Sequence, residues 1–287
     1  MNREEALKKS DDALKELADA LKQGKSDTLL KYLDTLSRFH RYSFGNCILI
    51  ALQRPDASMV AGFHRWKQMG RWVKKDEKGI AILAPMVSRK IKADESAEVG
   101  EEPSERRVST LRGFRIAYVF DVEQTEGKEL PEFANLAGDP GDKIDRLVEI
   151  TTGKGIDVEF VDALPGGANG VSLGGMVQVV SSLPAPQKFS TLVHELAHEL
   201  LHRGDRRSET TKVVRETEAE AVAYVVCRSV GLECSTRASD YIQLWNGDDK
   251  VLMQSLELIR DVATNIIAEL ESEAVAETTT EEVAHVA

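Results

Sequence analysis

Leucine and alanine return every three or four positions in the first part of the chain, which is the spacing of one helix face. This pattern covers residues 3–23 and 29–36, and a third apolar run covers 43–53. Pro55 ends that run, because proline cannot continue a helix. The spacing therefore predicts three helices before this proline and a short fourth helix over 63–69.

Beyond these helices, β-branched and aromatic residues cluster at 80–84 and 114–120, and they predict two strands of a small sheet. Residues 93–106, between the two strands, are acidic and aperiodic, and we expect a mobile loop inside the first domain. Residues 131–140 have a proline at each end and predict the linker to a second domain.

The second half mixes helices and strands before it becomes mainly helical. The pattern predicts a helix over 142–151, a strand over 157–161, a Gly-rich loop over 166–175, a strand over 176–181 and helices from about 189 to 270. The final residues, 272–287, are rich in Glu, Thr and Ala and predict a disordered tail. We therefore expect an α+β protein with domains over 1–130 and 131–271.

The chain has 287 residues, enough for two domains with separate cores. Its hydrophobic content of 42% and charged content of 30% are those of an ordinary globular protein. No apolar run approaches a membrane span, and the charged first residues do not form a signal peptide. Cys47, Cys227 and Cys234 follow no ligand spacing, so we expect reduced thiols in a cytoplasmic protein.

The net charge of −11 conceals a basic segment. Residues 24–92 hold fourteen Lys or Arg against five Asp or Glu, a local charge of +9, which leaves −20 for the rest of the chain, whose total is −11. Within this segment aromatic and basic side chains interleave, and such a mixture suits single-stranded nucleic acid. Trp66 and Trp72 could equally be core side chains. The predicted contact residues are Arg38, Arg41, Arg65, Trp66, Lys67, Arg71, Trp72, Lys74, Lys75 and Lys78.

The most specific motif is His194-Glu195-Leu196-Ala197-His198, inside an apolar helix-forming run. Residues four apart on a helix share a face, so both imidazoles can bind one cation. Glu195 can reach a water on that cation without being a ligand, which is the HExxH arrangement of zinc peptidases. We predict a Zn²⁺ site, with other divalent ions also acceptable to these ligands, and Glu195 as the catalytic base.

A catalytic zinc usually has three protein ligands, and the next helix supplies three glutamates. Glu216 and Glu220 share a helix face, whereas Glu218 is turned by about 200°. We expect Glu216 to be the third ligand and Glu220 to orient a histidine from outside the ligand set. The reverse assignment, or Glu218 as the ligand, stays open.

Three neighbouring features have both a chemical and a structural interpretation. His202 continues the histidine series, but each step of four residues advances about 6 Å, so a helix-end role is favoured over ligation. Tyr224 could stabilise an oxyanion, although a packed tyrosine is favoured. The strand over 176–181 is a candidate sheet edge on which an extended peptide could pair.

Several short motifs of the first half resemble the N-terminal domain of the ArdC antirestriction family. They include Tyr42-Ser43-Phe44-Gly45-Asn46, Gln53-Arg54-Pro55-Asp56-Ala57, Val60-Ala61-Gly62-Phe63 and Tyr118-Val119-Phe120-Asp121-Val122. This resemblance implies a single-stranded-DNA-binding module.

The second half is similar to the ImmA/IrrE-like zincin domain, through the HExxH motif and the Glu-x-x-x-Glu that follows it. The downstream motif of that domain reads Glu-x-x-Ala-Asn. Here Ala219 matches, and Glu220 stands where Asn is usual, which fits Glu216 as the ligand and leaves the role of Glu220 less defined. The resemblance spans about residues 25–230 and implies a metallopeptidase fold of phage, plasmid or other mobile-element origin.

Two functions are therefore compatible with the sequence. The first is a zinc-dependent endopeptidase of gluzincin type that binds single-stranded DNA and hydrolyses a protein or peptide substrate with a metal-activated water. The second is a non-proteolytic DNA-binding antirestriction factor whose metal site is structural or vestigial.

Overall fold

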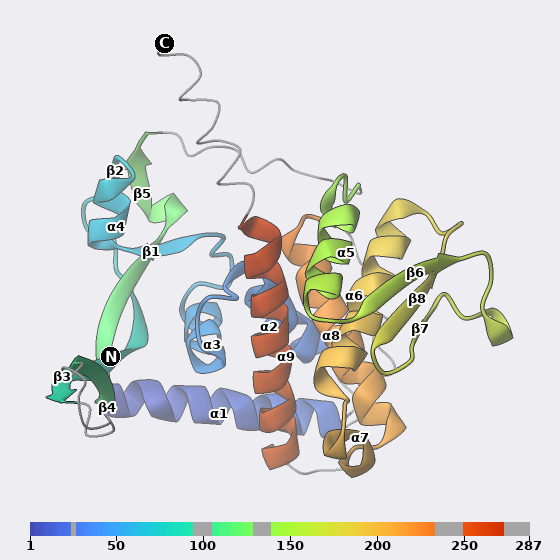
Figure 1. Cartoon of the computed structure of the whole chain (residues 1–287). Coiled ribbons are helices and arrows are strands. Elements are labelled where there is room, and N and C mark those ends of the chain that lie inside the picture. The colour runs from blue at the N-terminus through green and yellow to red at the C-terminus, as the bar shows by residue number, and fades with distance from the viewer. Residues whose placement is uncertain (24–26, 94–104, 129–138, 233–248, 273–287) are drawn as a thin grey trace, which may run out of the picture. The chain divides into compact units, whose positions relative to one another are not determined.

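The computed structural model describes residues 1–23, 27–93, 105–128, 139–232 and 249–272 (Figure 1). Within these ranges helices and strands are both abundant, which confirms the predicted α+β class. Most of the predicted mobile loop (93–106), linker (131–140) and disordered tail (272–287) lies outside the described residues.

Contacts divide the chain into two compact units. The first combines Met1–Asp12 with Ile48–Lys128, and the second combines Ala13–Cys47 with Glu129–Ala287. The division after residue 128 lies beside the predicted boundary at 130, but residues 13–47 group with the second unit. Helices α1 (Arg3–Lys22) and α3 (Phe44–Gln53) each contribute residues to both units.

The first unit is built on an antiparallel sheet. Its strands are β1 (Val60–Gly62), β4 (Glu105–Asp121) and β3 (Ile80–Ala93), in the order β1-β4-β3. A further antiparallel pair joins β2 (Arg71–Val73) to β5 (Thr125–Gly127), and α4 (Phe63–Gln68) follows β1 directly. The core contains Trp66 together with Ile80 and Val119, which pair across β3 and β4.

A buried carboxylate organises the end of β4. Asp121 accepts hydrogen bonds from the backbone N–H groups of Ser58, Met59 and Glu123 at 2.9, 3.1 and 3.0 Å. Gln124 completes a capping box on the short 3₁₀ helix η1 (Val122–Gln124), because its side chain accepts from the Asp121 N–H at 2.9 Å. Buried polar groups need such partners, so Asp121 holds two distant chain segments together.

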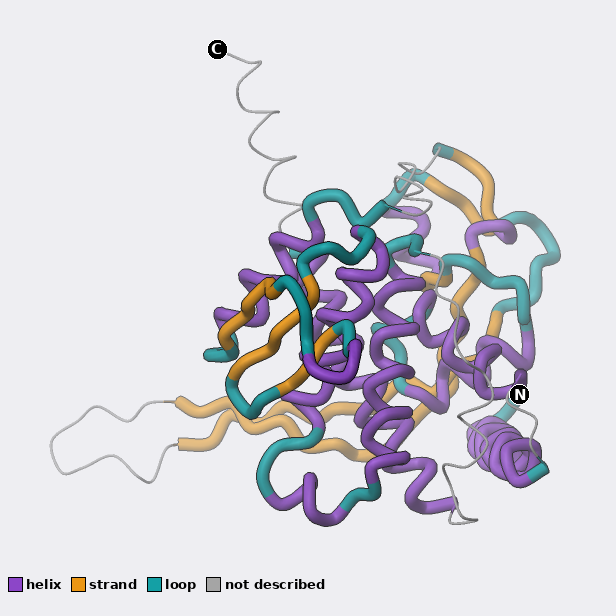
Figure 2. Tube along the Cα trace, turned by 90° about the vertical axis from the view of Figure 1, so that its right-hand side faces the viewer, coloured by secondary structure: helices purple, strands orange, loops and turns teal. Residues whose placement is uncertain are grey.

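The second unit has a three-stranded sheet on one side of a group of helices (Figure 1 and Figure 2). The strands β6 (Asp157–Val161), β8 (Met176–Val180) and β7 (Gly170–Ser172) follow in that order, with β6 parallel and β7 antiparallel to β8. Strand β8 is therefore central, and the prediction that 176–181 forms a sheet edge is wrong. The edges are β6 and β7, and β7 lies within the predicted Gly-rich loop.

The helices of this unit include α6 and α8, which carry the predicted site residues. They are α2 (Asp27–Arg38), α5 (Lys143–Gly153), α6 (Ala185–Leu201), α7 (Asp205–Glu209), α8 (Lys212–Ser229) and α9 (Asp249–Glu271). Helix α6 packs against α5, α8, β7 and β8, and α8 packs against α2 and α9 as well. Because α8 is covered on several sides, its buried residues are mainly alanine and valine.

Residues 27–47 are tied to the second unit by polar contacts as well as by packing. Arg228 of α8 pairs with Asp34 of α2 at 2.9 Å. Thr264 of α9 donates its hydroxyl to the carbonyl oxygen of His40 at 2.8 Å. Leu29, Leu33 and Leu36 of α2 are buried. Helix α2 is thus part of the scaffold that holds α8.

Candidate metal centre

Helix α6 presents its motif because its apolar residues occupy another face. Phe189, Leu192 and Leu196 are completely buried. His194 and His198 lie on an adjoining face, with side-chain exposures of 21% and 11%. Since residues four apart on a helix project in nearly the same direction, both rings reach toward α8.

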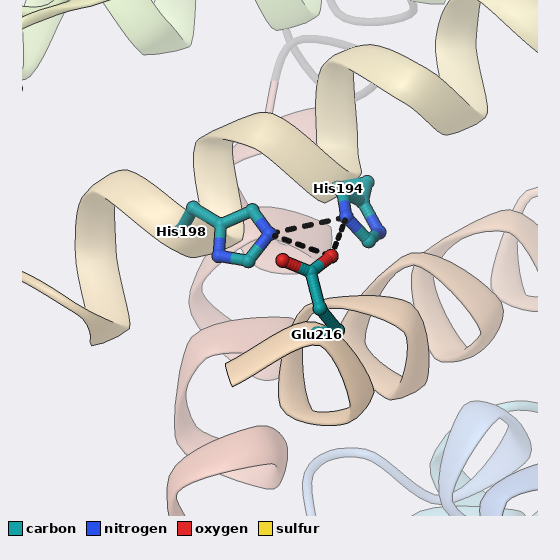
Figure 3. Close-up of side chains that lie close together, drawn as sticks. All are labelled: His194, His198 and Glu216. Atoms are coloured by element: carbon teal, nitrogen blue, oxygen red, sulfur yellow. Dashed lines mark hydrogen bonds and ion pairs between the residues drawn. The ribbon is translucent and has the colours of Figure 1, made fainter. Parts of the chain in front are cut away.

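The structure brings together the three residues that the sequence predicts as metal ligands (Figure 3). The Nε2 atoms of His194 and His198 are 3.1 Å apart, and each lies 3.6 Å from Oε2 of Glu216. Two nitrogens bound to one tetrahedral zinc ion at about 2.0–2.1 Å would be separated by about 3.3 Å. The spacing of these donor atoms therefore fits a single small cation.

Glu220 contacts the opposite edge of the His194 ring. Its Oε2 lies 3.4 Å from Nδ1 of His194, and its side chain is 44% exposed. A carboxylate at Nδ1 favours a proton on that nitrogen and leaves Nε2 free for a cation. Glu216 is 50% exposed, so the cluster is accessible to solvent from the α8 side.

Electrostatics at the cluster favour positive charge. Burial of His194 lowers its pKa, but hydrogen bonds to Glu216 and Glu220 outweigh burial and raise the pKa to about 9. The two histidines in turn hold the pKa of the Glu216 carboxyl far below its usual range. A bound cation would satisfy the same carboxylates that stabilise the His194 proton.

Glu195 lies beside the cluster and against the edge strand β7. The residue is only 9% exposed, and burial raises the pKa of its carboxyl. A Cβ atom added at Gly170 of β7 would lie 2.8 Å from Cγ of Glu195. Such close packing fixes the carboxylate, and a raised pKa is suited to accepting a proton near neutral pH.

His202, the C-cap residue of α6, and Glu218, the middle glutamate of α8, form a buried chain behind His198. Nδ1 of His202 lies 3.0 Å from Nδ1 of His198, and Nε2 of His202 lies 2.9 Å from Oε2 of Glu218. Arg206 donates to both carboxylate oxygens of Glu218 at 2.6 and 2.7 Å, and the Ser255 hydroxyl donates at 2.5 Å. Glu218 therefore faces away from the cluster, whereas His202 contacts a candidate ligand.

A second carboxylate of α6 was not among the predicted site residues. Glu199 is buried and accepts hydrogen bonds from the Ser172 hydroxyl at 2.6 Å and from the backbone N–H groups of Gly174 and Gly175 at 2.7 and 2.8 Å. It also pairs with Arg203. These contacts fasten the β7–β8 turn to α6. The sequence indicated this residue through a repeated pair: Glu199 directly follows the second histidine of the motif, as Glu195 directly follows the first.

The two tryptophans of the basic segment have different environments. Trp66 is completely buried, and its indole N–H donates to the carbonyl oxygen of Phe120 at 2.8 Å, so it is a core residue in this structure. Trp72 is 53% exposed. Phe114 and Tyr118 on β4, which the sequence analysis did not select, are 36% and 52% exposed.

The basic residues predicted to contact DNA fall into two groups. Arg38 and Arg41 belong to the second unit, where they pair with Asp34 at 3.2 Å and Glu271 at 2.7 Å. Arg71 donates to the Thr125 side chain and to the Lys128 carbonyl at 2.8 and 2.6 Å, which fastens β2 to β5. Among the other basic residues predicted to contact DNA, five in the first unit have exposed side chains: Arg65, Lys67, Lys74, Lys75 and Lys78.

Tyr224, the candidate oxyanion donor, lies on α8 one turn after Glu220 and is half-buried.

No helix among the described residues is long and apolar enough to cross a membrane.

Comparison with known proteins adds a family match in the first half. Residues 5–120 match the family model for the N-terminal domain of anti-restriction factor ArdC. An uncharacterized protein of Bacillus anthracis, pXO2-81, is 26% identical over 266 residues, which cover 78% of this chain and 44% of the relative. The chain thus spans less than half the length of that relative.

Two solved structures resemble the chain. A crystal structure of the antirestriction ArdC protein from the R388 plasmid in a metal-free state has a TM-score of 0.48 and 21% identity, and the match covers 80% of this chain and 86% of that one. A Mn(II)-bound structure of the same protein has a TM-score of 0.48 and 17% identity, with coverage of 92% and 97%.

Proposed function

The N-terminal part of this chain belongs to the ArdC antirestriction family, and from that premise we propose an antirestriction protein that binds single-stranded DNA and cleaves peptide bonds at a metal site. The observation that carries the peptidase part is the cluster of His194, His198 and Glu216, whose donor atoms all lie within 4.8 Å of one another. Among the described residues Cys47 and Cys227 are not joined in a disulfide, which agrees with the proposed action in the cytoplasm.

The cluster would hold a divalent cation through two imidazole nitrogens and one carboxylate. This donor set suits Zn²⁺ and also accepts Mn²⁺, and we propose Zn²⁺ as the functional ion. A cation at this position supplies Lewis-acid chemistry, because it lowers the pKa of a coordinated water and polarises a carbonyl group. Glu220 keeps the His194 ring oriented for ligation through its contact with Nδ1.

Glu195 is the proposed general base and acid. It follows the first histidine on α6, and its side chain lies against Gly170 of β7, since an added Cβ at Gly170 would meet Cγ of Glu195 at 2.8 Å. The carboxylate takes a proton from the attacking water and returns it to the amine of the leaving peptide. Its raised pKa favours this return step near neutral pH.

The free side of β7 is the proposed binding surface for the peptide. Among the described residues β7 is the last strand of its sheet and pairs only with β8. An extended peptide can add to such an edge through main-chain hydrogen bonds. Glu199 holds this edge beside α6, so a bound peptide would lie along the helix that carries Glu195.

The DNA-binding part is supported by the surface of the first unit. Arg65, Lys67, Lys74, Lys75 and Lys78 are exposed there, as is Trp72. Cations neutralise phosphates while an exposed indole stacks on a base. We therefore keep these residues, Trp72 included, as the proposed DNA contacts and remove Trp66, which is buried.

The peptidase proposal is tested by Glu195→Gln. The variant should bind one equivalent of Zn²⁺ and should bind oligo-dT with the affinity of the wild type, because Glu195 is neither a proposed metal ligand nor a proposed DNA contact. It should lose hydrolysis of an unstructured protein such as casein by about 10²-fold or more, the usual worth of a general base. Metal content is measured by plasma emission spectrometry. Equal antirestriction effect of the variant and the wild type in cells would sink the enzymatic account.

One observation favours the alternative, a DNA-binding factor with a structural metal site. The contacts of Glu218 join α6, α7, α8 and α9, so a cation held by α6 and α8 would also reinforce the fold. In that case the Glu195→Gln variant keeps its cellular effect, while Glu216→Gln, which removes a ligand, lowers the melting temperature.

A further inference from the structure

We propose that His202 and Glu218 form a buried relay that fixes the tautomer of His198, so that its Nε2 is left unprotonated and ready to bind the cation. This inference rests on the proposed metal site and adds two positioning residues to it. Neither residue would touch the cation or a substrate. Both act through His198, and both are inaccessible to solvent, with side-chain exposures of 0%.

The chain of contacts has a defined beginning. Glu218 accepts from Arg206 at both oxygens and from Ser255 at Oε1, at distances between 2.5 and 2.7 Å. A carboxylate held by these donors is ionised and can only accept. Nε2 of His202, 2.9 Å from Oε2, must therefore carry a proton.

The proton on Nε2 determines the rest of the chain. A neutral imidazole has one N–H, so Nδ1 of His202 has a free lone pair. This atom lies 3.0 Å from Nδ1 of His198, and the contact is a hydrogen bond only if His198 donates. With its proton on Nδ1, His198 presents a bare Nε2 toward Nε2 of His194 and Oε2 of Glu216.

The two candidate histidine ligands are therefore positioned by different means. Glu220 contacts Nδ1 of His194 directly, at a half-exposed position. His198 is oriented through a second imidazole and a fully buried carboxylate. The protein environment rather than solvent then sets the tautomer of His198, as expected for groups outside the ligand set that tune a metal site.

The test uses the full chain and four variants. In Glu218→Gln, Arg206 and Ser255 retain the amide oxygen, the NH₂ group faces His202, and the relay runs backwards, which places a proton on Nε2 of His198. In His202→Leu the relay is interrupted. In His202→Gln the amide accepts from His198 and donates to Glu218, so the relay is preserved. Glu199→Gln is the control, because Glu199 is an equally buried carboxylate outside the relay.

Two measurements are made on each protein. Long-range ¹H–¹⁵N spectra of the metal-free protein report the tautomer of His198, and competition with a chromophoric chelator gives the Kd for Zn²⁺. We expect the Nδ1–H tautomer in the wild type, His202→Gln and Glu199→Gln. Glu218→Gln should show the Nε2–H tautomer. The Kd should rise about 10- to 100-fold in Glu218→Gln and His202→Leu and change by less than about threefold in the other two variants.

The relay is overturned if His198 of the wild type carries its proton on Nε2. It is also overturned if the rise in Kd across the four variants matches their loss of thermal stability and does not separate the variants that keep the relay from those that lose it. If Glu218→Gln does not fold, the comparison of His202→Gln with His202→Leu decides. A wild type that shows the expected tautomer but binds no Zn²⁺ would refute the proposed metal site while leaving the relay intact.

Discussion

At the residue scale, four glutamates near one histidine pair are distinguished by where the helices place them. Glu195 packs against β7 and is buried, whereas Glu216 is half-exposed and points at both rings. Glu220 contacts the outer nitrogen of His194, and Glu218 is fully buried with Arg206. The sequence predicted Glu195 from the HExxH motif, and Glu216 and Glu220 from the helix face that they share. It left Glu218 open, because its partners Arg206 and Ser255 come from elements whose packing the sequence does not reveal.

The raised pKa of His194 predicts how metal-free protein responds to pH. The value of about 9 exceeds the ordinary 6.5, because Glu216 and Glu220 together outweigh burial. A raised folded-state pKa stabilises the fold fully below pH 6.5, and this stability is lost as pH rises toward 9. We expect the melting temperature of chelator-treated protein to fall over this interval, and to fall less in Glu220→Gln. A wild-type melting temperature that stays level or rises would contradict the prediction.

At the element scale, the sequence predicted most helices but only residues 80–84 and 114–120 of the long strands β3 and β4, and it missed the shortest strands. Periodicity placed helices at 3–23 and 43–53, close to the observed α1 and α3. Strands β1, β2 and β7 have three residues each, too few to show an alternating pattern. The sequence therefore predicts a loop where β7 lies and a sheet edge at β8. Only the antiparallel pairing of β7 with β8 makes β7 the edge beside Glu195.

The close approach of β7 to α6 predicts the effect of a side chain at Gly170. An added Cβ would meet Cγ2 of Thr191 at 2.6 Å and Cγ of Glu195 at 2.8 Å. Gly170→Val should displace β7 or Glu195 and reduce peptidase activity about 10²-fold, the cost of a small misplacement in a catalytic site. Zinc content should be unchanged. Gly153→Ala is the control, since its Cβ meets nothing within 4 Å, and activity is measured on the same casein substrate.

The different burial of the two tryptophans predicts different effects on DNA binding. Trp72→Ala removes an exposed indole and should weaken oligo-dT binding about tenfold, the worth of one stacked base, with little change in melting temperature. Trp66→Phe removes the hydrogen bond to Phe120 inside the core and should lower the melting temperature while the affinity stays constant. Fluorescence anisotropy of labelled oligo-dT at fixed salt measures both. Equal affinity of Trp72→Ala and wild type would remove Trp72 from the DNA site.

At the scale of the whole molecule, the family match and the compact units do not coincide. The match to the ArdC N-terminal domain covers residues 5–120, whereas residues 13–47 make their contacts with the second unit. The predicted domain range 1–130 followed from the linker expected at 131–140. Leucines of α2 indicated a buried helix face, but one sequence does not specify which partner covers that face. Helix α2 therefore lies in the segment that matches the ArdC N-terminal domain and packs against α8, the helix that carries Glu216.

This arrangement predicts which thermal transition depends on α2. Leu33 is completely buried in the second unit, so Leu33→Ala should cost about 2–5 kcal/mol of stability there. Ligand binding raises the stability of the unit that holds the site, so added Zn²⁺ identifies the transition of the second unit in calorimetry. We expect Leu33→Ala to lower that zinc-sensitive transition, and Val251→Ala, at a position 38% exposed on α9, to leave it nearly unchanged. If Leu33→Ala lowered only a zinc-insensitive transition, α2 would belong with the first domain, as the range 1–130 predicts.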